Sequence, residues 1–325
     1  MKYATRHVRG LAAGLLFATA IAGLSRAEDY PTHPVRIIVG FGAGSTADTP
    51  ARLLGQKFGD ALGQQFLIEN KPGAGSNVAA KYVARSPNDG YTLFMATAAQ
   101  TNYAGMTVDP TYDVVKDFAP ILRVASVPNI LVANPRLGVN NLKELIALAK
   151  TKPNQIFFAS SGVGSTTHFA GELINIMAGI KLVNVSYPGS AQALTDVMTG
   201  RIQLWFAPVS AAIQQVEKGD LKAIAVTTAQ RASIAPNVPT MAEAGLPGFD
   251  VGLWFGLLAP AGTAKSIVDK LASIANDALK SDDVIEPLHN IGVEPVGGTP
   301  EEFARYIDAE VKKATEVATA ANIRK

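Results

Sequence analysis

Short apolar runs alternate with amphipathic segments along most of the chain. Residues 35–41 form a β-rich apolar run, and in residues 47–62 the apolar positions recur every three or four residues, as on one face of a helix. Further strands are predicted at 66–69 and 92–96, with a helix at 77–84 between them. Because each strand is followed by a loop and then a helix, this half predicts a mostly parallel sheet with helices on both faces.

The same order restarts downstream. Helices are predicted at 142–151, 168–177 and 191–199, and strands at 156–159, 183–185, 202–206 and 223–227. We therefore expect two successive α/β units.

Two long apolar segments interrupt this alternation. One covers 119–132 and is broken at Pro128, and the other covers 249–260. We interpret both as crossings between two lobes, so that the helices predicted at 266–279 and 300–321 can return to the first lobe. The predicted division is a signal segment at 1–27, a discontinuous first lobe at 28–124 and 253–325, and a second lobe at 125–252.

The N-terminus has the pattern of a secretory signal peptide. Basic residues precede an apolar run at 11–24, and Ser25 and Ala27 supply small residues before a predicted cleavage after Ala27. The alternative is a membrane anchor, but this run is shorter than the roughly 20 residues that a spanning helix needs. We expect an exported, periplasmic protein.

Charge argues against two classes of partner. The formal net charge is +2, and removal of the signal segment would take away four basic side chains and leave the mature chain at about −2. A nearly neutral surface gives no support for nucleic acid or an anionic membrane as partner.

Several kinds of chemistry are also disfavoured. The chain has no cysteine, which excludes disulfides, cysteine-ligated metals and a cysteine nucleophile. No His/Asp/Glu cluster has the spacing of metal ligands, so neither a metal nor a cofactor is predicted. Residues 40–45 are similar to a dinucleotide-binding loop, but Ser45 stands where the third glycine should be. Neither a Gly-x-Ser-x-Gly elbow nor a P-loop occurs, and no nucleophile–base pair is visible, so an enzyme is not predicted.

Four loops rich in glycine, serine and threonine follow predicted strands, at 42–46, 160–167, 187–190 and 207–210. In open α/β sheets, ligands bind at the carboxyl ends of strands, where such loops lie. Glycine lets the backbone approach a ligand, and the helix N-terminus that follows offers unpaired N–H groups to an anion. None of the four loops contains Lys or Arg. The alternative for each loop is that its hydroxyl only caps the next helix.

The candidate ligand-binding residues all lie in or beside these loops. They are Phe41, Gly42, Ala43, Gly44, Ser45, Thr46, Ser161, Gly164, Ser165, Thr166, Tyr187, Gly189, Ala207 and Pro208. Two neighbours are interpreted as structural. Asp48 would repel an anionic ligand and is expected to brace its loop, and His168 is expected to pack or cap at the start of its helix.

These loops belong to a longer set of ordered motifs that resembles the Bug family, the periplasmic solute receptors of tripartite tricarboxylate transporters. The resemblance runs over residues 30–323. Its marks are Tyr30-Pro31, residues 34–39, Gly44-Ser45-Thr46-Ala47-Asp48, residues 69–75 and 87–93, residues 161–165 with His168, Tyr187-Pro188-Gly189-Ser190, Pro239-Thr240 with residues 243–245, and residues 254–257 with 259–263.

The resemblance implies a two-lobed periplasmic binding protein of the type II-like, Venus-flytrap kind, with two mostly parallel or mixed sheets. It implies a monomer that clamps a small carboxylate between loops 42–46, 161–166 and 187–190. It also implies delivery of the ligand to membrane permease subunits, without turnover. A ligand sensor for a signalling partner and a periplasmic hydrolase remain the alternatives.

Two departures from the family pattern affect the expected ligand. Ser45 stands where the family usually has a second glycine, so an extra hydroxyl can face the ligand. Ala207-Pro208 stand where the family often has an acid, which removes a partner for a ligand ammonium group. We therefore expect an aliphatic or aromatic mono- or dicarboxylate instead of an amino acid.

Overall fold

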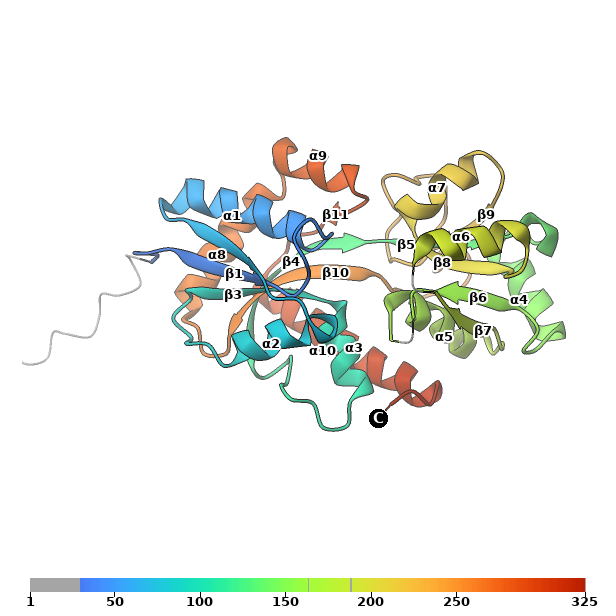
Figure 1. The fold of residues 1–325 in the computed structure, drawn as a ribbon, viewed down its shortest axis with the longest axis horizontal. Coiled ribbons are helices and arrows are strands. Elements are labelled where there is room, and N and C mark those ends of the chain that lie inside the picture. Colours follow the sequence, from blue (N-terminus) through green and yellow to red (C-terminus); the bar gives the residue numbers. More distant parts are fainter. Residues whose placement is uncertain (1–29, 163, 188, 325) are drawn as a thin grey trace, which may run out of the picture.

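The chain forms two β-sheets that lie end to end along the long axis of the molecule, each flanked by helices (Figure 1). The computed structural model describes residues 30–162, 164–187 and 189–324. The predicted signal segment at 1–27 lies outside these residues.

Sheet A has the strand order β11-β4-β10-β3-β1-β2. Its strands are β1 (Val35–Val39), β2 (Phe66–Asn70), β3 (Thr92–Thr97), β4 (Phe118–Val127), β10 (Leu253–Pro260) and β11 (Glu294–Pro295). β2, β1 and β3 run parallel, whereas β10, β4 and β11 pair antiparallel. Each face is sealed by an apolar core under its own set of helices.

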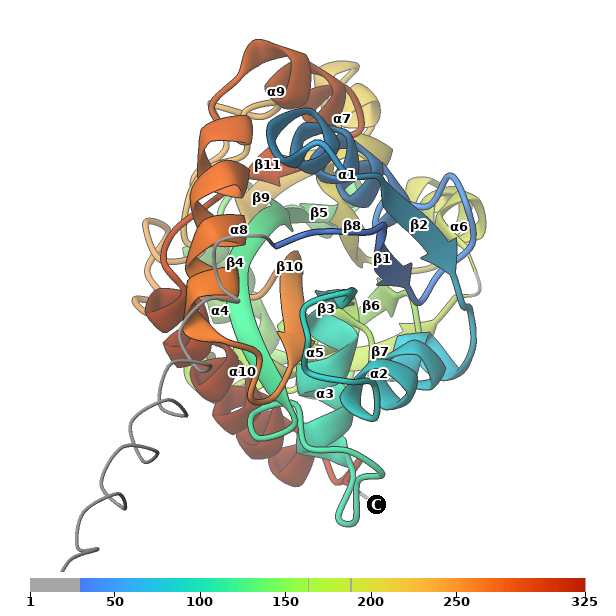
Figure 2. The ribbon, with the colours of Figure 1, turned by 90° about the vertical axis from the view of Figure 1, so that its left-hand side faces the viewer.

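The helices of this half divide between the two faces of sheet A (Figure 2). One set is α1 (Asp48–Leu62), α8 (Lys265–Ala278) and α9 (Asp282–Asn290), and the other is α2 (Asn77–Ala84), α3 (Ala98–Met106) and α10 (Pro300–Ala320). Burial of apolar side chains on both faces is the main force that holds such a layered fold together.

Sheet B has the order β7-β6-β8-β5-β9. Its strands are β5 (Asn129–Ala133), β6 (Phe157–Ser160), β7 (Val183–Ser186), β8 (Leu204–Pro208) and β9 (Lys222–Val226), and its helices are α4 (Leu142–Thr151), α5 (Thr166–Ala178), α6 (Ser190–Thr199) and α7 (Val209–Glu217). β7, β6 and β8 run parallel, and β5 pairs antiparallel with both β8 and β9. Both sheets are therefore mixed, and the α/β fold with two sheets is confirmed.

The crossing strands set the direction in which the two sheets face. Val127, the last residue of β4, pairs with Leu253, while Phe255 pairs with Thr97 at the carboxyl end of β3. After Pro128, Asn129 pairs with Pro208 at the carboxyl end of β8. The carboxyl ends of the parallel strands in the two sheets therefore face each other on either side of Pro128.

Most predicted elements are present within a residue or two of their predicted ends, and the helices at 77–84 and 142–151 match fully. The helices α3, α7 and α9 were not predicted. α7 follows the proline that ends β8, and α9 contains Pro287, so both begin or continue across a residue that normally signals a break. α3 has buried residues on more than one side and so lacks a clear polar face.

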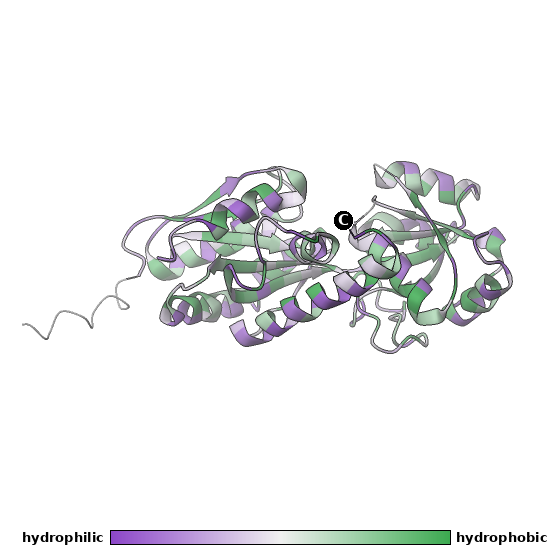
Figure 3. Ribbon diagram, turned by 90° about the horizontal axis from the view of Figure 1, so that it is seen from below, coloured by the Kyte–Doolittle hydropathy of each residue, from purple (hydrophilic) through white to green (hydrophobic). Residues whose placement is uncertain are grey.

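α10 joins the two halves of the molecule. Its Phe303 packs against sheet A over Gly256, where any added Cβ would overlap the phenyl ring. Its Ala314, Val317 and Ala318 belong to the core of sheet B. Figure 3 shows this long helix passing below both halves, with hydrophobic and hydrophilic patches alternating along it. The lobe boundaries at 124/125 and 252/253 stay a prediction. α10 packs on both of the lobes that these boundaries define.

α3 and α10 pack so closely at Gly105 that a side chain there would overlap the backbone of α10. A Cβ on Gly105 would lie 2.6 Å from the backbone carbonyl carbon of Ala314. We expect Gly105→Ala to lower the free energy of unfolding by about 1–3 kcal/mol, because the two helices must separate. The midpoint of urea unfolding measures this.

The matched control is Gly59→Ala in α1. There the nearest atom, the carbonyl oxygen of Gln64, is 3.4 Å from the added Cβ, and the better helix propensity of alanine is worth up to about 1 kcal/mol. Equal midpoints for the two variants would contradict the tight α3–α10 packing.

Candidate functional site

The loops that follow β1, β2 and β3 lie at the edge of sheet A that faces sheet B, and the loops after β6, β7 and β8 lie at the facing edge of sheet B. All four predicted loops are at these two edges. This is the edge at which an open α/β sheet normally binds its ligand.

Two of these loops share a sequence pattern and a conformation. Residues 42–46 and 162–166 both read Gly-x-Gly-Ser-Thr. In each, the serine N–H donates to the carbonyl of the first glycine over 3.2 Å. The middle glycine has a positive φ in both, 77° at Gly44 and 83° at Gly164, which an L side chain rarely adopts. The same turn therefore opens a helix on each side of the interlobe edge.

In the first loop, Asp48 secures the turn. Its carboxylate accepts hydrogen bonds from the Gly44 N–H at 2.9 Å, from Arg52 Nε at 2.7 Å and from Asn70 Nδ2 at 2.8 Å. Asn70 Nδ2 also donates to the carbonyl oxygen of Phe41 at 2.9 Å. Burial works to raise the pKa of Asp48, but these hydrogen bonds and the Arg52 charge hold that pKa below its usual value. The carboxylate is therefore ionised and directed into the loop.

In the second loop, His168 occupies the place of Asp48. Its Nδ1 accepts from the Gly164 N–H at 3.2 Å, and its Nε2 lies 3.6 Å from Glu172 Oε1. Burial lowers the pKa of His168. With Nδ1 acting as acceptor, the hydrogen-bond network assigns the ring proton to Nε2.

The two serines of the repeated pattern differ in their partners. Ser165 caps α5: its hydroxyl accepts from the His168 N–H at 3.2 Å, donates to the Gly162 carbonyl at 2.7 Å and lies 2.9 Å from Thr167 Oγ1. Ser45 Oγ is buried and has no hydrogen-bond partner among the described residues. The residue corresponding to Thr167 is Ala47, which has no hydroxyl to offer. Ser165 is thus engaged within its own loop, and Ser45 is not.

The other predicted residues of these loops are more open. Gly42, Ala43, Gly44 and Thr46 are exposed, and Phe41 is half-buried. On the facing edge, Ser161 is exposed, and Thr166 Oγ1 lies 3.5 Å from Asn129 Nδ2, which is buried at the start of β5.

The structure places three further predicted residues in different surroundings. Ala207 is fully buried in the core of sheet B and does not line the interlobe edge. Tyr187 turns toward α6, where its hydroxyl donates to Asp196 Oδ2 at 2.7 Å, and burial together with Asp196 raises its pKa to about 12. Pro208 is half-buried at the end of β8. Gly189, another predicted ligand-binding residue, is exposed at the N-cap of α6 and has no side chain to occupy that helix end.

Sequence reasoning missed Ser76, which follows β2. Ser76 is fully buried with a φ of 75°, and its Oγ has no partner among the described residues. It presses against Gly40, where an added Cβ would lie 1.8 Å from Ser76 Oγ. A glycine at the end of β1 and the Pro-Gly-Ala-Gly-Ser run after β2 were the available signals. Ser45 and Ser76 are therefore two buried, unpartnered hydroxyls in loops after neighbouring strands.

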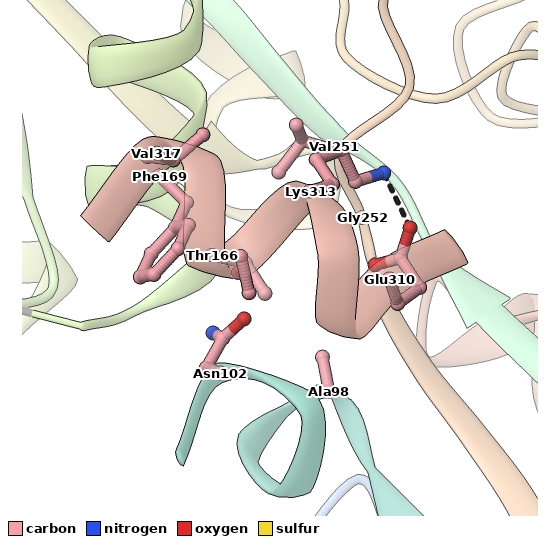
Figure 4. A pocket seen from close by; sticks show the side chains of 10 residues that line it. Ala98, Asn102, Thr166, Phe169, Val251, Gly252, Glu310, Lys313 and Val317 are labelled. Carbon is pink, nitrogen blue, oxygen red and sulfur yellow. Dashed lines mark ion pairs between the residues drawn. The ribbon is translucent and has the colours of Figure 1, made fainter. Parts of the chain in front are cut away.

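The unpredicted helix α3 also reaches the site. Asn102 Nδ2 donates to the Gly164 carbonyl at 2.9 Å, and an added Cβ on Gly164 would lie 2.9 Å from Met106 Sδ. Next to this contact is a small pocket between α3, α5 and α10, where Asn102 and Thr166 approach each other (Figure 4). Its floor carries the Glu310–Lys313 ion pair of α10. Burial raises the pKa of Glu310, although Lys313 opposes this.

Within residues 30–162, 164–187 and 189–324, no group of three or more His, Cys, Asp or Glu side chains is placed to hold a metal ion. Within the same residues, no helix is both long and apolar enough to cross a membrane.

Comparison with known proteins agrees along nearly the whole chain. The model of the tripartite tricarboxylate transporter family receptor matches residues 51–323. Protein BugT of Bordetella pertussis is 34% identical over 303 residues, covering 92% of this chain and 93% of that protein. A protein from the tcbD-tcbE intergenic region of Pseudomonas sp. strain P51 is 32% identical, covering 94% of this chain and 92% of its own length.

Solved structures show the same similarity. Rpa4515 of R. palustris, solved with adipate, is 37% identical with a TM-score of 0.71, covering 90% of this chain and 99% of that one. MatC from Rhodopseudomonas palustris, solved with malate, is 30% identical with a TM-score of 0.68, covering 89% of this chain and 99% of that one. With a family model and full-length relatives in agreement, the chain belongs to the family of tripartite tricarboxylate transporter receptors, the Bug proteins.

Proposed function

We propose that this protein is an exported periplasmic receptor that binds a small carboxylate between its two lobes and delivers it to the permease subunits of a tripartite tricarboxylate transporter. The observation that carries the proposal is the pair of Gly-x-Gly-Ser-Thr turns at the facing edges of the two sheets, with the Ser45 hydroxyl buried and without a partner among the described residues. A buried hydroxyl without a partner is costly. A ligand oxygen would satisfy it.

The donors of this site suit a carboxylate. The N-cap residues are Ala47 in α1 and Gly189 in α6, and neither makes a side-chain cap hydrogen bond with the described residues. The N–H groups of Asp48 and Thr49 at the start of α1 already donate to the Ser45 carbonyl. The first N–H groups of α6 and the partial positive charge of both helix ends favour an anion. Asp48, the nearest acid, is already held by three donors and so does not compete for them. The adipate- and malate-bound relatives support dicarboxylates as the first class to test.

The site offers little to a ligand ammonium group. Ala207 is in the core, Pro208 has no charge, and the Asp196 carboxylate near Tyr187 is paired with Arg201 at 3.1 Å. We therefore propose a plain mono- or dicarboxylate, aliphatic or aromatic, in preference to an amino acid.

The lobes are proposed to close on the ligand, with residues 28–124 and 253–325 in one and 125–252 in the other, while α10 keeps its contacts with both sheets. Such closure is a shift of population toward the state in which the ligand touches both edges. Binding and release, without turnover, is the proposed role, in a monomer that is exported with cleavage after Ala27.

The first experiment is thermal unfolding of the mature protein against a ligand panel of C4–C6 dicarboxylates, aromatic acids and the matching amino acids. A ligand at about 100 times its Kd should add about 2.7 kcal/mol of stability, which raises Tm by several degrees in a protein of this size. Stabilisation by an amino acid, with none by its des-amino analogue, would contradict the proposed ligand class.

Ser45→Ala should weaken binding of the best acid roughly ten- to a hundredfold, since a hydrogen bond to an ionised group is worth about 1.5–3 kcal/mol. Isothermal titration calorimetry measures this. Ser165→Ala is the matched comparison in the repeated turn. There we expect mainly the loss of a helix cap, about 1 kcal/mol of stability, with a smaller change in Kd. Ser86→Ala, two residues beyond the end of α2, is the control and should change neither the affinity nor the stability by as much. An equal loss of affinity in both loop variants would mean that Ser45 has no special role.

Stability should fall below pH 6.5 in a way that depends on His168. Its folded pKa lies below the usual 6.5, so the unfolded chain takes up a proton that the folded chain does not. The stabilising contribution is therefore complete above pH 6.5 and is lost as the pH falls toward the folded pKa. Urea midpoints at pH 7.5 and 5.5 should differ less in His168→Gln than in the wild type.

His33→Gln, at an exposed position, is the control and should keep the wild-type difference. Burial raises the pKa of the neighbouring Glu172, which acts in the opposite direction but is present in all three proteins. An unchanged difference in His168→Gln would exclude a neutral, buried histidine as its source.

A further inference from the structure

A second cavity lies beside the crossing segments, away from the repeated turns. It has a volume of about 420 Å³. Sheet A contributes Arg123 and Ser126 of β4, α10 contributes Tyr306, and the segment after β9 contributes residues 228–231. In the strand order, β10 and β3 separate β4 from β1, which precedes the Gly42–Thr46 loop.

A β-bulge places two polar side chains of β4 in this cavity. Gly256 pairs with Arg123 and Phe255 pairs with Ala125, so Val124 is an extra residue in the strand. In a regular strand, residues three positions apart point to opposite faces. The bulge changes this alternation, and Arg123 and Ser126 both line the cavity. Bulges commonly redirect side chains in this way next to functional sites.

Arg123 has no direct hydrogen-bond or ion-pair partner for its side chain among the residues that the structure describes. Its Nε is buried without a hydrogen-bond partner, and within residues 30–162, 164–187 and 189–324 its guanidinium makes no ion pair within 4.0 Å. Its Cζ lies 4.2 Å from the centre of the Tyr306 ring, which supports one face of the guanidinium. The N–H donors along the edge of the guanidinium have no protein partner among the described residues. A cationic group that is partly buried and unpaired is unfavourable, and an anionic ligand would pair with it.

The other charged side chains that line the cavity each have a hydrogen-bond or ion-pair partner. Arg231 Nε is 2.9 Å from Glu243 Oε2. Asp250 Oδ1 accepts from the Ala229 N–H at 3.0 Å. Glu294 Oε1 accepts from the backbone and hydroxyl of Ser233 at 2.8 and 2.6 Å, and its Oε2 is 3.2 Å from His289 Nε2.

Glu310, on the neighbouring turn of α10, attracts Arg123 electrostatically but is paired with Lys313. Among the charged side chains in the described part of this lining, Arg123 is therefore the one that has neither a hydrogen-bond nor an ion-pair partner, whereas the Asp250 carboxylate is met by a backbone N–H.

We propose that this cavity is a second ligand site, which takes a small oxyanion such as phosphate, sulfate or a carboxylate. The anion binds the free edge of the Arg123 guanidinium, with the Ser126 hydroxyl as an additional donor. Because both halves of the molecule line the cavity, an anion here contacts the two lobes at their hinge. Its binding is therefore coupled to lobe closure, and by linkage the effect on the interlobe ligand is reciprocal.

The test is a titration of the mature protein with inorganic phosphate at constant ionic strength, followed by Tm and by calorimetry. We expect saturable stabilisation in the wild type and at least a tenfold weaker response in Arg123→Gln. Arg123→Lys, which keeps the charge but not the bidentate edge, should give an intermediate response. Arg201→Gln, which removes a surface arginine paired with Asp196, is the matched control and should respond like the wild type.

Ser45→Ala separates this site from the interlobe site. It should retain the full phosphate response, even where its carboxylate binding is lost. A phosphate response that disappears in Ser45→Ala but persists in Arg123→Gln would overturn the proposal and assign the anion to the interlobe edge. A wild type without any saturable response to phosphate or sulfate would overturn it as well. Circular dichroism of each variant without phosphate confirms that a lost response is not a loss of fold.

Discussion

The antiparallel pairing of β10 with β3 and β4 is the constraint on which the arrangement of the site depends. It places the carboxyl ends of β4 and β3 at the same end of β10. After Pro128, β5 begins beside the carboxyl end of β8. A shift of register by one residue would turn every inward side chain of these strands to the other face. The core that covers both faces of sheet A makes such a shift costly, and so the facing of the two strand edges is fixed by burial.

On this frame, the two loops show how a site can be prepared without Lys or Arg. Each turn is closed by its own hydrogen bonds and secured from four residues downstream, by Asp48 in one and His168 in the other. The side chains of Asp48 and His168 are therefore already hydrogen-bonded within their own loops. The groups left for a ligand are backbone N–H donors and the hydroxyl of Ser45. Preparing the loop in advance lowers the cost of ordering it on binding.

α10 adds a third link beside the two crossing strands. Its first half packs on sheet A, its last turns belong to the core of sheet B, and Lys313 donates to the carbonyl of Asp250 in the second crossing. The charged residues at its centre lie between the interlobe contact of α3 on one side and the Arg123 cavity on the other. Any change in the angle between the lobes must be accommodated along this helix, which gives the two cavities a common mechanical element.

The sequence by itself determined the order of strands, loops and helices, the two crossings, and the presence of glycine-rich loops after the strands that end at the facing edges. These features depend on hydrophobic period, on proline and on glycine, which act over a few neighbouring residues. It also contained the repeated Gly-x-Gly-Ser-Thr pattern, whose equivalence becomes clear only from the shared turn geometry. Tertiary structure decided that Ser165 is engaged while Ser45 has no partner among the described residues, that Ala207 is in the core, and that Tyr187 turns to Asp196. It also decided that Ser76 Oγ and Arg123 Nε are buried without a partner in that part of the chain, and that α3 contacts the turn at Gly164. The physical reason is that burial and hydrogen-bond partners are set by residues distant in the sequence, and no local pattern specifies which of them will meet.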